Sequence, residues 1–88
     1  MPFTAPIKDL LFDMQHLAQL DTLAQDTPVF ADATLDTAQA ILEEAARFHQ
    51  EVTAPLNHSG DVTPASWKDG EVRTSPGFKD AYRLYCQG

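Results

Sequence analysis

The chain has 88 residues, of which 43 % are hydrophobic and 22 % charged, and its formal net charge is −7. This length allows one domain with a thin core, because a chain of this size buries only about 60–65 % of the surface that it exposes when unfolded. The composition excludes an intrinsically disordered chain, and the acidic balance excludes autonomous binding to nucleic acid or to an anionic membrane surface.

The negative charge is concentrated in the first part of the chain. Residues 1–64 carry ten acidic side chains against Lys8 and Arg47, a net charge of −8, whereas residues 65–88 carry four basic side chains against three acidic ones. We expect a solvated acidic surface that keeps the protein soluble.

Cys86 is the single cysteine, so an internal disulfide is excluded, which fits a reducing compartment. The chain has no apolar run of about 18 residues and no basic-then-apolar start typical of a secretory signal. These features predict a cytoplasmic protein without a membrane partner.

A first helix is predicted over residues 7–20. Pro6 suits the first helical position, and Thr4 could cap the helix. Apolar side chains then recur at helical spacing, at Ile7, Leu10, Leu11, Met14, Leu17 and Ala18. Leu20, Leu23 and Ala24 could extend this helix as far as the break at Asp26-Thr27-Pro28.

A second helix is predicted over residues 35–57, with Thr34 or Asp36 as its cap. Its apolar stripe consists of Ala38, Ile41, Leu42, Ala45, Phe48, His49 and Val52. Glu43 and Arg47 are spaced to pair across one turn. Pro55 predicts a kink followed by a further turn, and the segment 57–61 should end the helix.

Residues 62–75 lack helical periodicity, and Asp69-Gly70 predicts a short hairpin turn within them. A third helix is predicted over residues 76–87, with Ser75 as its N-cap, Pro76 at its first position and Gly88 as its C-cap. The expected fold class is therefore all-α, with about three helices and one irregular or hairpin excursion.

The residues with reactive side chains do not form a recognisable catalytic or metal-binding pattern. His16, His49 and His58 lack the spacing that puts two metal ligands on one helix face, so we interpret His49 as a partly buried structural residue and His58 as a cap or turn residue. Cys86 is interpreted as a small hydrophobic residue. Adjacent Glu43 and Glu44 diverge on a helix and should face solvent.

The serines and glycines add no site either. Ser59, Ser66 and Ser75 stand in turn or cap contexts, and no nucleophile elbow surrounds any of them. The glycines at 60, 70, 77 and 88 are too scattered for a phosphate-binding loop. The sequence thus predicts no catalytic, cofactor-binding or metal-binding residue in this chain.

The aromatic residues near the end of the chain admit two interpretations. Trp67 could fold back over the helices or remain free for a partner surface. Core packing is the favoured interpretation for Phe78, Tyr82 and Tyr85.

The first of several ordered sequence blocks is the run from Phe3 to Phe12, with an aromatic-x-Ala-Pro-x-x-Asp-x-x-Phe pattern. This pattern resembles the start of a subgroup of acyl-CoA dehydrogenases with an additional N-terminal helix, a subgroup that includes methylthiopropanoyl-CoA dehydrogenase-like enzymes. A second run from Ala40 to Phe48 is similar to the first long domain helix of that subgroup. The resemblance continues in order through Glu51-Val52, Ala54-Pro55-Leu56-Asn57, Ser59-Gly60-Asp61, Trp67, Asp69-Gly70, Val72, Pro76-Gly77-Phe78-Lys79 and Ala81-Tyr82.

The resemblance implies that residues 1–88 are the N-terminal helical segment of a larger enzyme that binds FAD and oxidises an acyl-CoA to the enoyl-CoA. In that family the glutamate base and the main flavin contacts belong to later domains. This chain would then pack against the remainder of its parent polypeptide, with a structural role and no catalysis of its own. It would contact the acyl-CoA substrate only as part of the full-length parent.

A different class of function stays open. The apolar helix faces could make the chain a free-standing helical module that associates with itself or with a partner protein.

Overall fold

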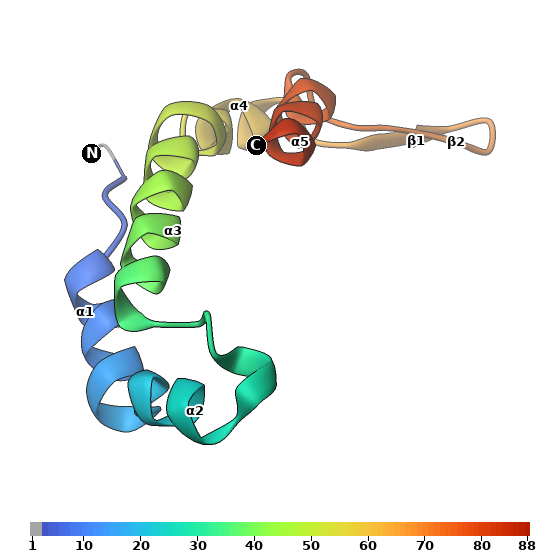
Figure 1. Ribbon diagram of the computed structural model, residues 1–88. Helices are drawn as coiled ribbons and strands as arrows, with labels where there is room; N and C mark the ends of the chain where they lie inside the picture. The colour runs from blue at the N-terminus through green and yellow to red at the C-terminus, as the bar shows by residue number, and fades with distance from the viewer. Residues whose placement is uncertain (1–2) are drawn as a thin grey trace. The chain divides into compact units, whose positions relative to one another are not determined.

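The computed structural model describes residues 3–88, which form two compact units. The N-terminal unit is Thr4–Arg47, and the C-terminal unit is Phe48–Gly88 together with Phe3. Helices account for 66 % of the structure, and the described residues contain a single two-stranded antiparallel sheet (Figure 1). The predicted all-α fold class is confirmed.

The N-terminal unit starts with α1 (Ile7–Phe12), which continues directly into the π-helical turn η1 (Asp13–Leu17). Pro6 is the N-cap of α1 and not its first helical residue, and no side chain caps the helix, so the predicted roles of Pro6 and Thr4 are wrong. The backbone of Pro6 is not helical (φ −81°, ψ 66°), yet its carbonyl accepts the N–H of Leu10 at 3.0 Å. A proline at this position loses no hydrogen bond.

The predicted first helix, 7–20, ends early, because the chain leaves helical geometry at Gln19. The Ala18 N–H bonds to the Asp13 carbonyl at 2.9 Å, five residues back, and Gln19 then adopts a left-handed conformation with φ 52°. A separate helix follows, α2 (Leu20–Asp26). The predicted break before Pro28 is confirmed, since Thr27 is extended and a short 3₁₀ turn, η2 (Pro28–Phe30), comes next.

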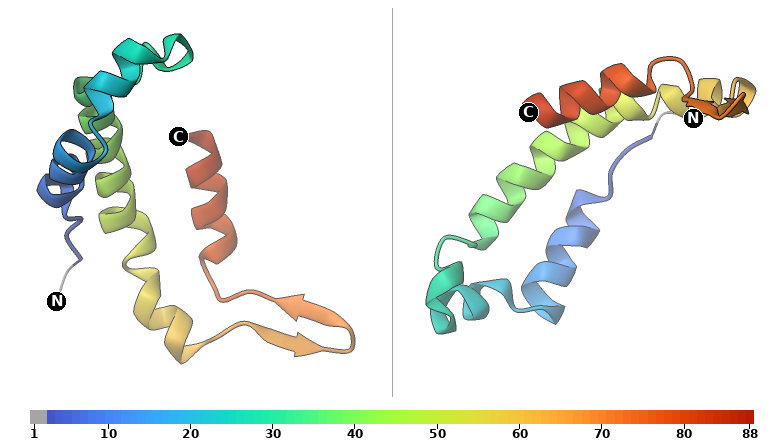
Figure 2. Two further views of the ribbon diagram at one scale, coloured as in Figure 1. Left: turned by 90° about the horizontal axis from the view of Figure 1, so that it is seen from below. Right: turned by 90° about the vertical axis from the view of Figure 1, so that its right-hand side faces the viewer.

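The longest helix is α3 (Leu35–Phe48), whose last residue belongs to the C-terminal unit. Of the two predicted caps, Thr34 and Asp36, Thr34 caps this helix, because Thr34 Oγ1 accepts the N–H of Thr37 at 3.3 Å. Asp21 adds a second cap from α2, since its Oδ1 accepts the N–H of Leu35 at 3.0 Å. Within the N-terminal unit, α1 and α3 run in opposite directions (Figures 1 and 2).

The ion pair predicted between Glu43 and Arg47 is wrong, because Arg47 pairs with Glu44 instead. Residues three and four apart are both neighbours on a helix, so either partner was within reach. Glu43 turns to the preceding turn and accepts a hydrogen bond from the Gln39 amide at 3.1 Å.

The C-terminal unit continues from Phe48 into the π-helical turn η3 (His49–Thr53), followed by α4 (Leu56–Val62). The interruption predicted at Pro55 is confirmed, since the chain makes a turn at Ala54 and Pro55. The predicted end at 57–61 is wrong, because these residues lie inside α4. The helix restarts when the Ala54 carbonyl accepts the N–H of Asn57 at 3.1 Å.

The predicted hairpin is also confirmed. Strands β1 (Ser66–Lys68) and β2 (Glu71–Arg73) pair antiparallel, with Trp67 opposite Val72. Asp69 and Gly70 both have positive φ, 53° and 82°, as a type I′ turn requires. Every strand residue is exposed, and the hairpin extends away from α4 and from the last helix, α5 (Phe78–Gln87) (Figures 1 and 2).

Helix α5 begins two residues later than the predicted 76–87. Its N-cap is Gly77, in a left-handed conformation with φ 87°, so the predicted roles of Ser75 and Pro76 are wrong. Ser75 is buried, and its backbone carbonyl accepts the N–H of Phe78 at 3.2 Å. Gly88 is the C-cap, as predicted.

The core is as thin as the length suggests. Among residues 3–88, the buried apolar residues are the three alanines Ala24, Ala46 and Ala81, and no large side chain is fully buried. The large apolar side chains therefore keep much of their surface in contact with solvent, and a group of them forms the groove described next.

Candidate functional site

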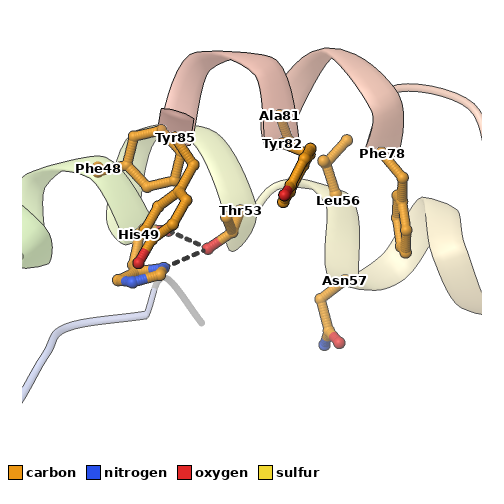
Figure 3. A pocket seen from close by; sticks show the side chains of 9 residues that line it. All are labelled: Phe48, His49, Thr53, Leu56, Asn57, Phe78, Ala81, Tyr82 and Tyr85. Atoms are coloured by element: carbon orange, nitrogen blue, oxygen red, sulfur yellow. Dashed lines mark hydrogen bonds between the residues drawn. The ribbon is translucent and has the colours of Figure 1, made fainter. Parts of the chain in front are cut away.

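An aromatic groove lies within the C-terminal unit and has a volume of about 420 Å³ (Figure 3). Its walls come from the end of α3, from η3, from α4 and from α5. The lining residues are Phe48, His49, Thr53, Leu56, Asn57, Phe78, Ala81, Tyr82 and Tyr85.

Helix α5 supplies one wall. Phe78, Ala81, Tyr82 and Tyr85 follow the i, i+3, i+4, i+7 spacing that places side chains on one helix face. At the far end of this row, the Tyr85 ring meets the Phe48 ring with centroids 5.8 Å apart and planes tilted by 59°. Such tilted aromatic pairs are favourable, so this contact ties α5 to the end of α3.

Two glycines allow α4 and the start of α5 to approach closely. A Cβ atom at Gly60 would lie 2.7 Å from Cζ of Phe78, so the phenyl ring occupies the space that a side chain would need. A Cβ atom at Gly77 would lie 2.9 Å from Cδ2 of Leu56, and the φ of Gly77, +87°, is one that L-residues rarely adopt. A side chain at position 60 would therefore displace the ring of Phe78, and one at position 77 would displace the end of Leu56 and also be strained by the positive φ.

The turn η3 supplies the polar edge of the groove. The His49 carbonyl accepts the Ala54 N–H at 2.8 Å and the Thr53 hydroxyl at 3.2 Å. Thr53 Oγ1 also lies 3.0 Å from Nδ1 of His49 (Figure 3). The Thr53 hydroxyl thus connects the backbone carbonyl and the ring of His49 at this edge of the groove.

The groove overturns the core-packing interpretation of three aromatic residues. Phe78, Tyr82 and Tyr85 are 42 %, 70 % and 62 % exposed, respectively. Their helix does bury one residue, Ala81, but the rings line an open groove and not a closed core. Helical spacing correctly placed them on one face, and it carries no information on whether another element covers that face.

The histidines are distributed over separate elements. His49 is exposed, contrary to the predicted partial burial, and His58 lies inside α4 and is neither a cap nor a turn residue. His16, on η1, contacts the ring of Phe12 at a centroid distance of 4.7 Å. Within residues 3–88, no group of three or more His, Cys, Asp or Glu side chains is arranged to hold a metal ion.

The other singled-out residues lie outside the groove. Trp67 is 70 % exposed on the hairpin, so it does not fold back over the helices. Cys86 is exposed on α5, and Glu43 and Glu44 are exposed as predicted. Two serines are not in the expected turn or cap contexts, because Ser59 lies inside α4 and Ser66 lies in β1.

The groove offers mainly apolar contacts with a polar edge. Rings and the Leu56 side chain form most of its lining, while His49, Thr53 and Asn57 are its polar members apart from the tyrosine hydroxyls. Such a surface can bind apolar side chains or a flat apolar group. The sequence analysis did not predict the packing role of Gly60 and Gly77. This role depends on contacts with Phe78 and Leu56, which lie far from these glycines along the chain.

None of the helices in residues 3–88 is long and apolar enough to cross a bilayer. No protein-family model matches the chain, and no solved structure matches it significantly. The chain is similar to 3-methylmercaptopropionyl-CoA dehydrogenase from Ruegeria pomeroyi, with 37 % identity over 82 residues. The match covers 93 % of this chain and spans only 14 % of that protein. This similarity agrees with the resemblance of the sequence blocks to acyl-CoA dehydrogenases.

Proposed function

We propose that this chain is the N-terminal helical segment of a larger FAD-dependent acyl-CoA dehydrogenase of the cytoplasm, in which it has a packing role. The observation that carries the proposal is the 37 % identity over 82 residues to a protein of which those residues make up only 14 %. The whole enzyme would oxidise an acyl-CoA thioester to the enoyl-CoA, and this segment alone would not catalyse the reaction.

The surface of the chain supports a packing role. Its large apolar side chains are extensively exposed, among them Phe12, Ile41, Trp67 and Tyr82 at 58 %, 63 %, 70 % and 70 %. Apolar surface of this kind is stabilised when another protein surface removes it from water, by about 25 cal/mol for each Å².

The flavin is assigned to the remainder of the proposed enzyme. A phosphate cradle needs glycines whose backbone N–H groups are open to the ligand. Here the ring of Phe78 fills the space at Gly60, and the side chain of Leu56 fills the space at Gly77. The glycines beside the groove thus serve helix packing and do not fit a flavin diphosphate.

Reading the gene beyond codon 88 tests the proposal. We expect an open reading frame of several hundred further codons, because the matched residues are 14 % of the related dehydrogenase. A stop codon directly after codon 88 in the native gene would reject the proposal.

The product of the complete gene provides the biochemical test. When purified, it should contain FAD and convert a methylthiopropanoyl-CoA or another acyl-CoA to the enoyl-CoA in the presence of an electron acceptor. A purified complete protein that holds no flavin and oxidises no acyl-CoA would contradict the assigned activity, even if its reading frame is long.

A free-standing association module is the alternative function, and the exposure of Tyr82 and Tyr85 favours it over a solitary monomer. In that case the 88-residue chain would form oligomers through its apolar faces. Light scattering at high protein concentration tests this alternative, because a compact monomer would count against self-association.

A further inference from the structure

We propose that the aromatic groove is the docking site for an apolar segment of the polypeptide that follows Gly88. This inference rests on the proposed function, because it requires a longer chain. Beyond the proposed function, it names the surface of residues 3–88 that would be covered in the complete protein and the segment that would cover it.

The composition of the groove suits a protein partner. Tyr82 and Tyr85 expose 70 % and 62 % of their surface on the same wall, beside the partly exposed Phe78. Aromatic residues are enriched at the centre of protein interfaces, where they bring a large contact area with few rotatable bonds. The tyrosine hydroxyls and the His49 edge can satisfy polar groups of the partner backbone.

The groove is already formed without its occupant. Phe78 packs on Gly60, Leu56 packs on Gly77, and Phe48 meets Tyr85 at 5.8 Å, so three contacts fix the walls. A preformed site loses little conformational entropy when a partner enters it. The volume of about 420 Å³ accommodates side chains from a short apolar segment.

The position of the groove favours the chain's own continuation as the occupant. Tyr85 lines the groove, and its carbonyl accepts the N–H of Gly88 at 3.3 Å, so a polypeptide that continues from Gly88 starts beside the site. A tethered segment acts at an effective concentration of about the mM range, far above that of a second molecule.

Photo-cross-linking of the complete gene product tests this docking. Benzoylphenylalanine is introduced in place of Tyr82, which keeps an aromatic ring, and in a matched control in place of Lys79, an exposed residue of α5 outside the groove. We expect a severalfold higher cross-link yield from position 82, with the product mapped by peptide mass spectrometry to residues after 88 of the same molecule.

Nitration of the unsubstituted complete protein gives a second readout that needs no variant. The segment contains only two tyrosines, Tyr82 and Tyr85, and both line the groove. Their nitration by tetranitromethane should be severalfold lower in the native protein than in the unfolded protein.

Three results would overturn the docking proposal: cross-links from position 82 to a second copy, a yield no higher than that of the position 79 control, or full nitration of both tyrosines in the native protein. They differ from a failure of the proposed function, which the gene itself reveals as a stop after codon 88. A long reading frame with an uncovered groove would leave the enzyme assignment intact and reject only the docking.

Discussion

The two units use different chemistry to hold similar helices. The N-terminal unit, Thr4–Arg47, carries eight acidic side chains against two basic ones, a net charge of −6, whereas the segment 48–88 carries five against four, a net charge of −1. In the first unit, polar caps at Thr34 and Asp21 fix the start of α3. In the second unit, Gly60 of α4 and Gly77, the N-cap of α5, leave room for the side chains of Phe78 and Leu56. Polar caps thus fix the start of α3 in the acidic unit, whereas close apolar contacts shape the groove.

Each unit contains a π-helical turn, and the chain continues differently after each of them. Both η1 and η3 are π-helical turns closed by a bond to a carbonyl five residues back, Ala18 to Asp13 and Ala54 to His49. After the first turn, Gln19 interrupts the helix with its positive φ. After the second, Pro55 permits a new helix, because proline fits the start of a helix. The residue that follows the π turn therefore decides how the chain proceeds.

The largest predicted effect on the groove unit comes from Gly77→Ala. The new Cβ would meet Leu56 at 2.9 Å while the backbone holds φ +87°, so we expect the free energy of unfolding to fall by about 2–3 kcal/mol. The measurement is urea unfolding followed by circular dichroism on the 88-residue chain.

Gly70→Ala is the matched control, because Gly70 also has a positive φ, +82°, but no atom lies within 4 Å of the position that its Cβ would take. It should lower the free energy of unfolding by only about 1 kcal/mol, the conformational part alone. Equal losses for the two variants would show that the contact between Gly77 and Leu56 does not hold the groove.

Truncation of Phe78 is the second largest expected effect. Phe78→Ala removes the ring that packs on Gly60, and since this ring is 42 % exposed we expect a loss of about 1–3 kcal/mol, less than for a fully buried phenylalanine. Lys79→Ala, on the same helix but outside the groove, should change the stability by at most about 0.5 kcal/mol. Similar unfolding midpoints for both variants would argue against a packed wall.

The cap of α3 tests the role of polar contacts in the N-terminal unit. Thr34→Ala should cost about 1 kcal/mol, because the N–H of Thr37 loses its acceptor, whereas Thr34→Ser keeps a hydroxyl and should cost much less. Thermal unfolding by circular dichroism measures both. If alanine and serine behave alike, the hydroxyl does not stabilise this end of the helix.

The smallest effect is expected at the ion pair between Arg47 and Glu44. Both side chains are well exposed, 61 % and 70 %, so Arg47→Gln should lower the stability by no more than about 0.5 kcal/mol, and high salt should remove that difference. A salt-independent loss above about 1 kcal/mol, on the order of a buried interaction, would show that Arg47 has a further role.

Local rules predicted the features that local chemistry determines. The turn at Asp69-Gly70 and the interruption at Pro55 each depend on a few neighbouring residues, and both were predicted correctly. Thr34 is one of the two caps predicted for α3. The break at Gln19 was missed because the apolar stripe continues through Leu20 and Leu23, which belong to a new helix. Periodicity does not reveal a π turn that shifts the register of the stripe.

The groove could be predicted only in part. The spacing of Phe78, Tyr82 and Tyr85 indicated a common face on α5, but their exposure depends on which elements cover that face. The contacts of Gly60 with Phe78 and of Gly77 with Leu56 join positions 18 and 21 residues apart, beyond the reach of any local pattern. Tertiary contacts of this kind determine the structural role of a glycine, which composition and spacing do not reveal.

The most direct test of the account compares the isolated 88-residue chain with the product of its complete gene. Each protein is incubated with FAD, and the flavin that it retains is measured after gel filtration. The account predicts that the complete protein keeps stoichiometric FAD and that the isolated chain keeps none. Flavin held firmly by the isolated chain would contradict the packing role assigned to these helices.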